Sequence, residues 1–319
     1  MDCIYDTLSQ KLPLITAKDI FRCNGISNGL VSFKYANEWF NIVEGRGTGN
    51  PVELLEMLQI PFSISSIEEL FECIDIENII IFLPRDLLKH YMEINISYKQ
   101  LLFFYSAFYV EKIDNQRVIL KITYDDTRYV LHKDEIQRIS TISTFPLEKS
   151  IYIVKLKDAS YEIDKSYSKQ NLLDRINIFL GHDIVKDESR IKISGVNMYD
   201  ALVNIINYPM RCWNKTEKIR QNFFIASLNA GTVGLYRYEF ANAIADIPSI
   251  NQSDICEKLK RSASAWREIG YRLAFFQESN IPIDDDCRKY IAPIIEDIKE
   301  LELTSMRDLR EYLRGDIKI

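Results

Sequence analysis

The sequence predicts an α+β fold, in which a region that combines short helices with an antiparallel sheet is followed by an all-helical region. Apolar runs of strand length recur between residues 78 and 156. From residue 167 onward, apolar residues instead recur every three or four positions, which is the period of a helix. The polar segment 158–166 (DASYEIDKS) separates the two patterns. We therefore expect two domains, residues 1–157 and residues 158–319.

The strands of the first region are predicted from apolar runs that turn residues interrupt. Residues 78–83 (NIIIFL) form a continuous apolar run that ends at Pro84, as a buried strand does. Residues 101–110 and 117–124 flank the polar segment 114–116, and this order predicts a hairpin. The other elements predicted here are strands at 128–132 and 150–156 and helices at 15–21, 54–58 and 133–139.

The second region carries amphipathic segments throughout, with Trp266 predicted to lie in the core. The acidic residues 284–286 are interpreted as the first turn of a helix rather than a metal site, because carboxylates there complement the helix dipole. The predicted helices are 167–180, 198–206, 213–230, 234–247, 254–277 and 284–313.

The composition excludes several classes of protein. Apolar residues make up 47% and charged residues 27%, which is typical of a globular protein rather than a disordered or fibrous one. The 46 acidic residues outnumber the 40 basic ones, so we expect no nucleic-acid partner. Only 11 glycines are available for phosphate-binding loops. The glycine run at 45–49 follows no predicted strand, so we interpret it as a flexible surface turn rather than a dinucleotide site.

The sequence predicts a cytoplasmic protein without a membrane partner. Its first ten residues lack the basic and apolar segments of a secretory signal, and the longest apolar run, 101–110, is too short to span a bilayer. The six cysteines are widely spaced, with no CxxC pair and no histidine at ligand spacing. We therefore expect reduced thiols and neither a metal nor another cofactor.

Cys3 is the candidate nucleophile. It directly precedes the helix-like segment 4–12, and a thiol at a helix N-terminus has its pKa lowered by the helix dipole. The alternative is a small residue near a frayed terminus. A thiol nucleophile usually needs an imidazole base, and the chain offers His90, His132 and His182. We select His90 because it follows the predicted strand 78–83, although a structural role is the alternative for each histidine.

Two further segments hold candidate substrate-binding residues. Two of the scarce glycines precede Tyr236 and Arg237 within residues 229–240, where the backbone can approach a ligand closely. The alternative is a helix connection whose arginine pairs with a carboxylate. Tyr105 and Ser106 belong to the aromatic-rich start of the predicted hairpin, which could line a hydrophobic cleft.

The chain resembles the family of butirosin biosynthesis protein H. The members of this family combine a papain-like (cysteine-peptidase-like) N-terminal domain with a helical C-terminal domain. The resemblance covers most of the chain. Its segments are residues 2–4, 78–88 and 101–124 in the first region and residues 193–196, 229–247 and 262–273 in the second.

The resemblance implies acyl transfer through a cysteine thioester in specialised-metabolite biosynthesis, as in antibiotic pathways. The implied partners are an acyl or peptidyl carrier protein and a small-molecule amine. The chain departs from the family pattern at the catalytic triad: Asp2 replaces the histidine before the nucleophile, and Ser106 matches the position of the base. Ile122 or Thr123 matches the position of the orienting aspartate, and residues 98–131 contain no histidine.

The sequence leaves two main hypotheses. The first is a carrier-protein-dependent acyltransferase that forms an amide, with Cys3 as its nucleophile. The second is a catalytically inactive papain-like scaffold that binds a biosynthetic intermediate or a partner protein. A peptidase ranks last, because amide hydrolysis demands the missing histidine. The oligomeric state stays open, a homodimer included.

Overall fold

A computed structural model describes most of the chain, and it divides into two compact units. The first unit comprises Met1–Ile20 and Thr48–Lys165, and the second comprises Phe21–Gly47 and Ser166–Ile319. Each unit is therefore built from two separate stretches of the sequence. The described residues are 3–35, 38–46, 50–73, 75–84, 87–88, 105–123, 125–142, 149–158, 160–186, 188, 190–208, 213–229, 232–248, 250 and 253–315.

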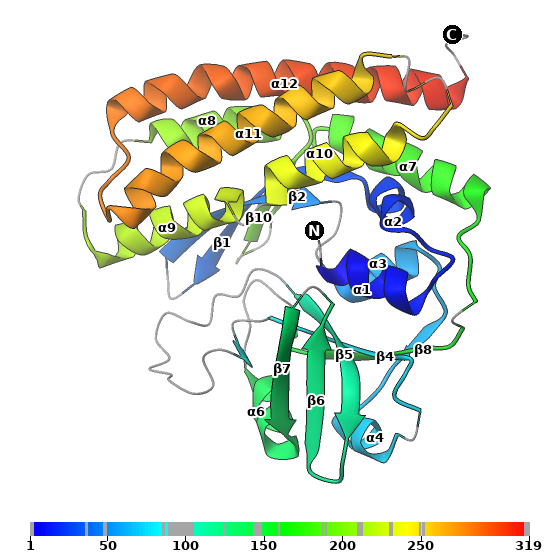
Figure 1. Ribbon diagram of the computed structural model, residues 1–319. Coiled ribbons are helices and arrows are strands. Elements are labelled where there is room, and N and C mark those ends of the chain that lie inside the picture. The colour runs from blue at the N-terminus through cyan, green and yellow to red at the C-terminus, as the bar shows by residue number, and fades with distance from the viewer. Residues whose placement is uncertain are drawn as a thin grey trace. The chain divides into compact units, whose positions relative to one another are not determined.

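The first unit contains an antiparallel sheet, which in the described residues has six strands (Figure 1). The predicted hairpin is confirmed, with Tyr109 opposite Lys121, and the strand predicted at 78–83 lies beside it. In sheet order the strands are β3 (Phe62–Ile64), β8 (Tyr152–Leu156), β4 (Ile79–Leu83), β5 (Ser106–Ile113), β6 (Arg117–Ile122) and β7 (Asp125–His132).

Two helices of the first unit, α3 and α4, begin after residues whose side chains satisfy free backbone donors. The Asn50 side chain accepts from the Val52 amide at the start of α3, and Ser66 and Glu69 form a reciprocal capping box at α4. Such caps replace hydrogen bonds that the first turn of a helix lacks. The helices are α1 (Cys3–Lys11), α3 (Pro51–Met57), α4 (Ile67–Glu72) and α6 (Lys133–Thr141).

The strand β4 lies at the centre of this unit. All five of its residues are buried, so both faces of the strand are covered, which accounts for its continuous apolar run. On one face, Ile81 lies opposite Phe108, and both belong to a core that includes Leu70 of α4 and Ile136 of α6. The fold class predicted for this region, α+β with an antiparallel sheet, is confirmed.

The second unit also contains an antiparallel sheet, with the order β2-β1-β10-β9 in the described residues. Helices α8, α9 and α10 contact this sheet, and α11 packs on α9, α10 and α12 (Figure 1). The strands are β1 (Ile26–Tyr35), β2 (Glu38–Arg46), β9 (Ile184–Lys186) and β10 (Arg190–Ser194). The helices are α2 (Ala17–Asn24), at the unit boundary, and α7 (Lys165–Leu180), α8 (Asn197–Asn207), α9 (Lys215–Asn229), α10 (Thr232–Ile244), α11 (Ile255–Glu278) and α12 (Asp285–Arg314).

The expectation that residues 158–319 are all-helical is wrong, because β9 and β10 lie within them. The strand β10 has the alternating sequence RIKIS and pairs with β1, where Ile193 lies opposite Leu30. Of the two strands, β10 has a partner, β1, near the other end of the chain, and β9 pairs with β10. The helical periods on either side obscure so short an alternation.

The interpretation of residues 45–49 as a turn without a preceding strand is also wrong at its start. The strand β2 ends at Arg46, so it runs directly into the glycine run. Gly45 is buried, and its carbonyl accepts a hydrogen bond from Arg237. Residues 47–49 lie outside the described part of the chain.

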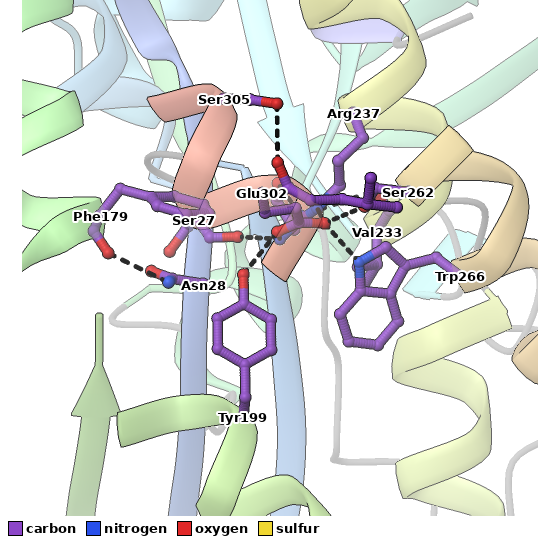
Figure 2. Close-up of polar contacts among 12 residues, drawn as sticks. Ser27, Asn28, Phe179, Tyr199, Val233, Arg237, Ser262, Trp266, Glu302 and Ser305 are labelled. Carbon is purple, nitrogen blue, oxygen red and sulfur yellow. Dashed lines mark hydrogen bonds and ion pairs between the residues drawn. The ribbon is translucent and has the colours of Figure 1, made fainter. Parts of the chain in front are cut away.

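Gly195 forms the turn that joins β10 to α8. Its φ of +74° is in the left-handed region, and a Cβ there would lie 1.8 Å from the carbonyl oxygen of Gly181. The buried Asn28 side chain holds the turn, because it accepts from the Gly195 amide and donates to the Gly195 carbonyl. It also donates to the Phe179 carbonyl (Figure 2). This position therefore requires glycine.

Among the described helices, none combines the length and the apolar character needed to cross a membrane.

We expect Gly195→Ala to lower the free energy of unfolding by more than about 3 kcal/mol, because backbone strain is added to a clash with Gly181. Urea denaturation measures the change. Gly315→Ala is the matched control, since Gly315 has a φ of +81° but nothing within 4 Å of a Cβ, and it should cost only about 1 kcal/mol. Equal costs at the two positions would contradict this account.

Candidate functional site

Cys3 is the first residue of α1, as the sequence predicts. The apolar side of this helix is buried through Ile4, Tyr5 and Leu8, and α1 packs against β5 (Figure 1). A group at this end of a helix lies at the positive end of the helix dipole, which favours a thiolate over a thiol.

The other end of α1 is fixed beside the sheet by Lys11. Its ammonium group donates to the Glu77 carbonyl, just before β4, and lies 5.7 Å from the ring centroid of Tyr109 in β5. Burial lowers the pKa of Lys11, against the opposing effects of Glu77 and Asp75. The Lys11 side chain thus holds the C-terminal end of α1 against the neighbouring strands β4 and β5.

The residues that the sequence resemblance aligns with a base and its orienting acid lie at one end of the hairpin. Ser106 begins β5 and Ile122 ends β6, and the antiparallel register places both beyond the Tyr109–Lys121 pair. Ser106 is half-buried and Ile122 is buried. The half-buried Thr123 follows, and its hydroxyl oxygen has no hydrogen-bond partner within the described residues. These positions therefore offer hydroxyl and apolar groups in place of an imidazole and a carboxylate.

The histidines that the structure describes do not replace the missing base at this end. His132 ends β7 opposite Arg117, at the other end of the hairpin, and its backbone amide donates to Glu135 at the start of α6. His182 belongs to the second unit, and its Nδ1 lies 3.2 Å from the Asn197 side-chain oxygen. His90 lies outside the described residues, so its assignment as the base stays a prediction.

Tyr105 is a packed residue next to Ser106. Its hydroxyl donates to the carbonyl of Lys149, and its ring contacts Tyr152 edge to face at 5.5 Å between centroids. Successive side chains of an extended chain point to opposite sides, so Tyr105 and Ser106 do not share a face. Helix α1 thus packs against β5, the strand that begins at Ser106, whereas Tyr105 is part of the core.

Tyr236 and Arg237 are both buried in the second unit. The Tyr236 ring lies 5.7 Å from that of Phe21. The guanidinium of Arg237 forms an ion pair with Glu302, at 3.0 Å between Nε and Oε1 (Figure 2). It also donates to the backbone carbonyls of Ser27, Gly45 and Val233. All five of its N–H donors have acceptors, so it has no donor left for a ligand.

Glu302 is the centre of this network. Its carboxylate accepts from Arg237 twice and also from the hydroxyls of Tyr199 and Ser262 and the indole of Trp266 (Figure 2). Burial raises the pKa of Glu302, but Arg237 and the hydrogen bonds from Ser262 and Tyr199 outweigh burial and leave the pKa below its ordinary value. The sequence left two hypotheses for Arg237, a ligand-binding residue and an arginine that pairs with a carboxylate. The structure shows the second.

Glu302 was not selected from the sequence, although a signal was present. It lies four positions after Ile298 and seven before Leu309, on the apolar stripe of α12, where an acidic residue must find a buried partner. In the part of the chain that the structure describes, no three acidic, cysteine or histidine side chains gather as they would around a metal ion.

Comparisons with known proteins do not assign the chain: no family model matches it, and no curated protein matches its sequence.

We expect Thr7→Val to raise the free energy of unfolding by about 1 kcal/mol. Thr7 lies one turn after Cys3 in α1, is fully buried, and its hydroxyl has no hydrogen-bond partner among the described residues. Thr7→Ser is the control: it keeps the hydroxyl, loses a methyl group and should destabilise. Thermal denaturation compares the two variants. A loss of stability in Thr7→Val would contradict the prediction, because it would mean that the Thr7 hydroxyl stabilises the folded state.

We expect Glu302→Gln to lower the free energy of unfolding by about 3–5 kcal/mol, because Arg237 would stay buried without its counter-charge. Glu300→Gln, an exposed change on the same helix, should cost less than about 0.5 kcal/mol. Urea denaturation measures both.

The effect of Glu302→Gln should also depend on pH. The folded pKa of Glu302 lies below its unfolded value, so its contribution is complete above the unfolded pKa and is lost as the pH falls through the folded pKa. The stability difference between wild type and Glu302→Gln should therefore shrink in acid, and a difference that grew in acid would contradict the assigned ionisation.

Proposed function

We propose that this protein is a cysteine-dependent acyltransferase of specialised metabolism, which transfers an acyl group from a carrier-protein thioester to an amine. One observation carries the proposal: α1 begins at Cys3 and packs against β5 of an antiparallel sheet. In papain-like proteins, which the sequence resembles, the nucleophile also begins a helix that packs on such a sheet. The α+β fold of the first unit supports the same conclusion.

The reaction we propose has two steps. The Cys3 thiolate attacks the thioester carbonyl, a carbon–sulfur bond forms to Cys3, and the carrier's sulfur leaves as a thiolate that takes a proton from water. The amine then attacks the Cys3 thioester and loses a proton, while Cys3 leaves as a thiolate. A thiolate is a good leaving group in both steps, so this exchange needs less general-base assistance than peptide hydrolysis.

The proposed roles of the other residues follow from this sequence of steps. The helix dipole of α1 supplies part of the activation of Cys3. His90 accepts the proton that the amine loses, and the Ser106 hydroxyl on β5 orients the substrate. An acyl or peptidyl carrier protein and a small-molecule amine are the proposed partners.

A second candidate function is a papain-like scaffold that binds an intermediate or a partner protein without turnover. The observation that favours it is that the half-buried Ser106 and the buried Ile122 lie at one end of the hairpin. The resemblance aligns these two residues with the family's histidine and aspartate, and neither can act as a base. The reactivity of Cys3 distinguishes the two candidates.

We expect iodoacetamide to label Cys3 with a midpoint well below pH 8.5, because only the thiolate reacts and the helix dipole favours it. Peptide mass spectrometry resolves each cysteine across the pH series. Cys256 and Cys287 are internal references, since burial raises the pKa of each thiol. An ordinary midpoint at Cys3 would favour the scaffold.

Acyl transfer from carrier-protein thioesters then tests the enzyme directly. Cys3→Ala should abolish the transfer. Cys73→Ala should leave it unchanged, since Cys73 is the half-buried residue that follows α4 and has no role in the proposed reaction. Transfer that survives Cys3→Ala would overturn the proposal.

A further inference from the structure

Helices α10 and α11 approach each other closely at Gly234. A Cβ at this position would lie 2.8 Å from the Ala263 carbonyl oxygen, so glycine allows a contact that a larger residue would prevent. One turn further along α10, Tyr238 lies beside α11. Its ring centroid is 5.6 Å from the Lys260 ammonium nitrogen and 5.4 Å from the Arg267 guanidinium carbon.

Lys260 and Arg267 belong to a row of side chains along one face of α11. Lys260, Ser264, Arg267 and Tyr271 follow each other at spacings of four, three and four residues, which places them on the same side of a helix. Tyr238 is 38% exposed and Tyr271 is 77% exposed. We call Tyr238, Lys260, Arg267 and Tyr271 the basic-aromatic stripe. The small Ser264 lies between the two cations.

The two cations of the stripe differ from Lys258 and Arg272, which lie on the same helix. Lys258 pairs with Asp254 and Asp308, and Arg272 pairs with Glu268. Within the described residues, neither Lys260 nor Arg267 forms an ion pair. The stripe is thus a patch of unneutralised positive charge on a chain whose formal net charge is −6.

Three of the four residues of the stripe, Tyr238, Arg267 and Tyr271, are of types that contribute most at protein interfaces. Tyrosine and arginine are enriched among the residues on which binding energy depends. Contact with the Tyr238 ring restricts the Lys260 and Arg267 side chains before binding, so less conformational entropy is lost when a partner docks.

We propose that the basic-aromatic stripe docks an acidic helical segment of a partner protein. Lys260 and Arg267 are seven residues apart, about 10 Å along α11. Carboxylates seven residues apart on a partner helix match this spacing, and an apolar residue between them would contact Tyr238, which lies between the two cations. Tyr271, four residues beyond Arg267, would contact the next turn of the partner. The stripe belongs to the second unit and its binding does not involve Cys3, so it stands or falls separately from the proposed acyl transfer.

A pair of synthetic helical peptides tests the proposal on the full chain. One peptide carries two glutamates seven residues apart with leucine midway, and the other carries glutamines in place of the glutamates. Fluorescence anisotropy at low salt should show binding of the glutamate peptide at least tenfold tighter than the glutamine peptide. The difference should fall by 0.5 M salt, which screens exposed charges.

Charge-reversed variants locate the binding. Lys260→Glu with Arg267→Glu should reduce binding at least tenfold, whereas Lys112→Glu, an exposed lysine on β5 of the other unit, should leave it unchanged. An equal loss of binding in both variants would mean that the peptide is attracted by the charge of the protein in general rather than by the stripe, and would overturn the proposal.

Two further measurements keep the test independent of how the variants fold. Amide chemical shifts of unmodified protein should change around Tyr238, Lys260, Arg267 and Tyr271 when the glutamate peptide is added, and shifts confined elsewhere would overturn the proposal. Sedimentation of the protein alone tests self-association, and sedimentation with anionic lipid vesicles tests membrane binding. Self-association or vesicle binding that Lys260→Glu with Arg267→Glu abolishes would assign the stripe to a second copy or to a membrane instead.

Discussion

The buried ion pair between Arg237 and Glu302 determines how the second unit is assembled. Both side chains are fully buried, and the cost of removing two charges from water is offset only because every donor and acceptor is used. The network joins four helices, α8, α10, α11 and α12, to the strands β1 and β2. It therefore fixes the helical layer over the sheet at one place, which apolar packing alone would not specify.

Local patterns predicted most of the elements. The continuous run of β4, the hairpin of β5 and β6 and the six helices from α7 to α12 follow from periods of apolar residues and from turn residues close by. The strands β1, β2, β3, β9 and β10 and the helix α4 were missed. In the sheet of the second unit, only the pairing of β1 with β10 joins distant parts of the chain, since β1 and β2 form a local hairpin. The strand β9 is exposed on all three residues, so no apolar alternation marks it.

The candidate site was predictable only in part, for a similar reason. The start of a helix at Cys3 is a local property, and the sequence predicted it. The partner of Arg237 is not local: Glu302 lies far along the chain, and only an acidic residue on an apolar stripe hints at it. Sequence spacing can propose that an arginine binds something, but folded geometry decides between a ligand and the protein's own carboxylate.

The interleaving of the two units has a consequence for how the chain reaches its native state. Residues 48–165 of the first unit are inserted between β2 and α7 of the second, and α1 precedes both. During synthesis β1 and β2 leave the ribosome long before β10, so the hairpin must wait without its neighbouring strand while the insert folds. No cut between residues 48 and 165 releases an intact second unit, because any such cut separates β1 from β10. No continuous fragment of the chain therefore contains the whole second unit without the insert.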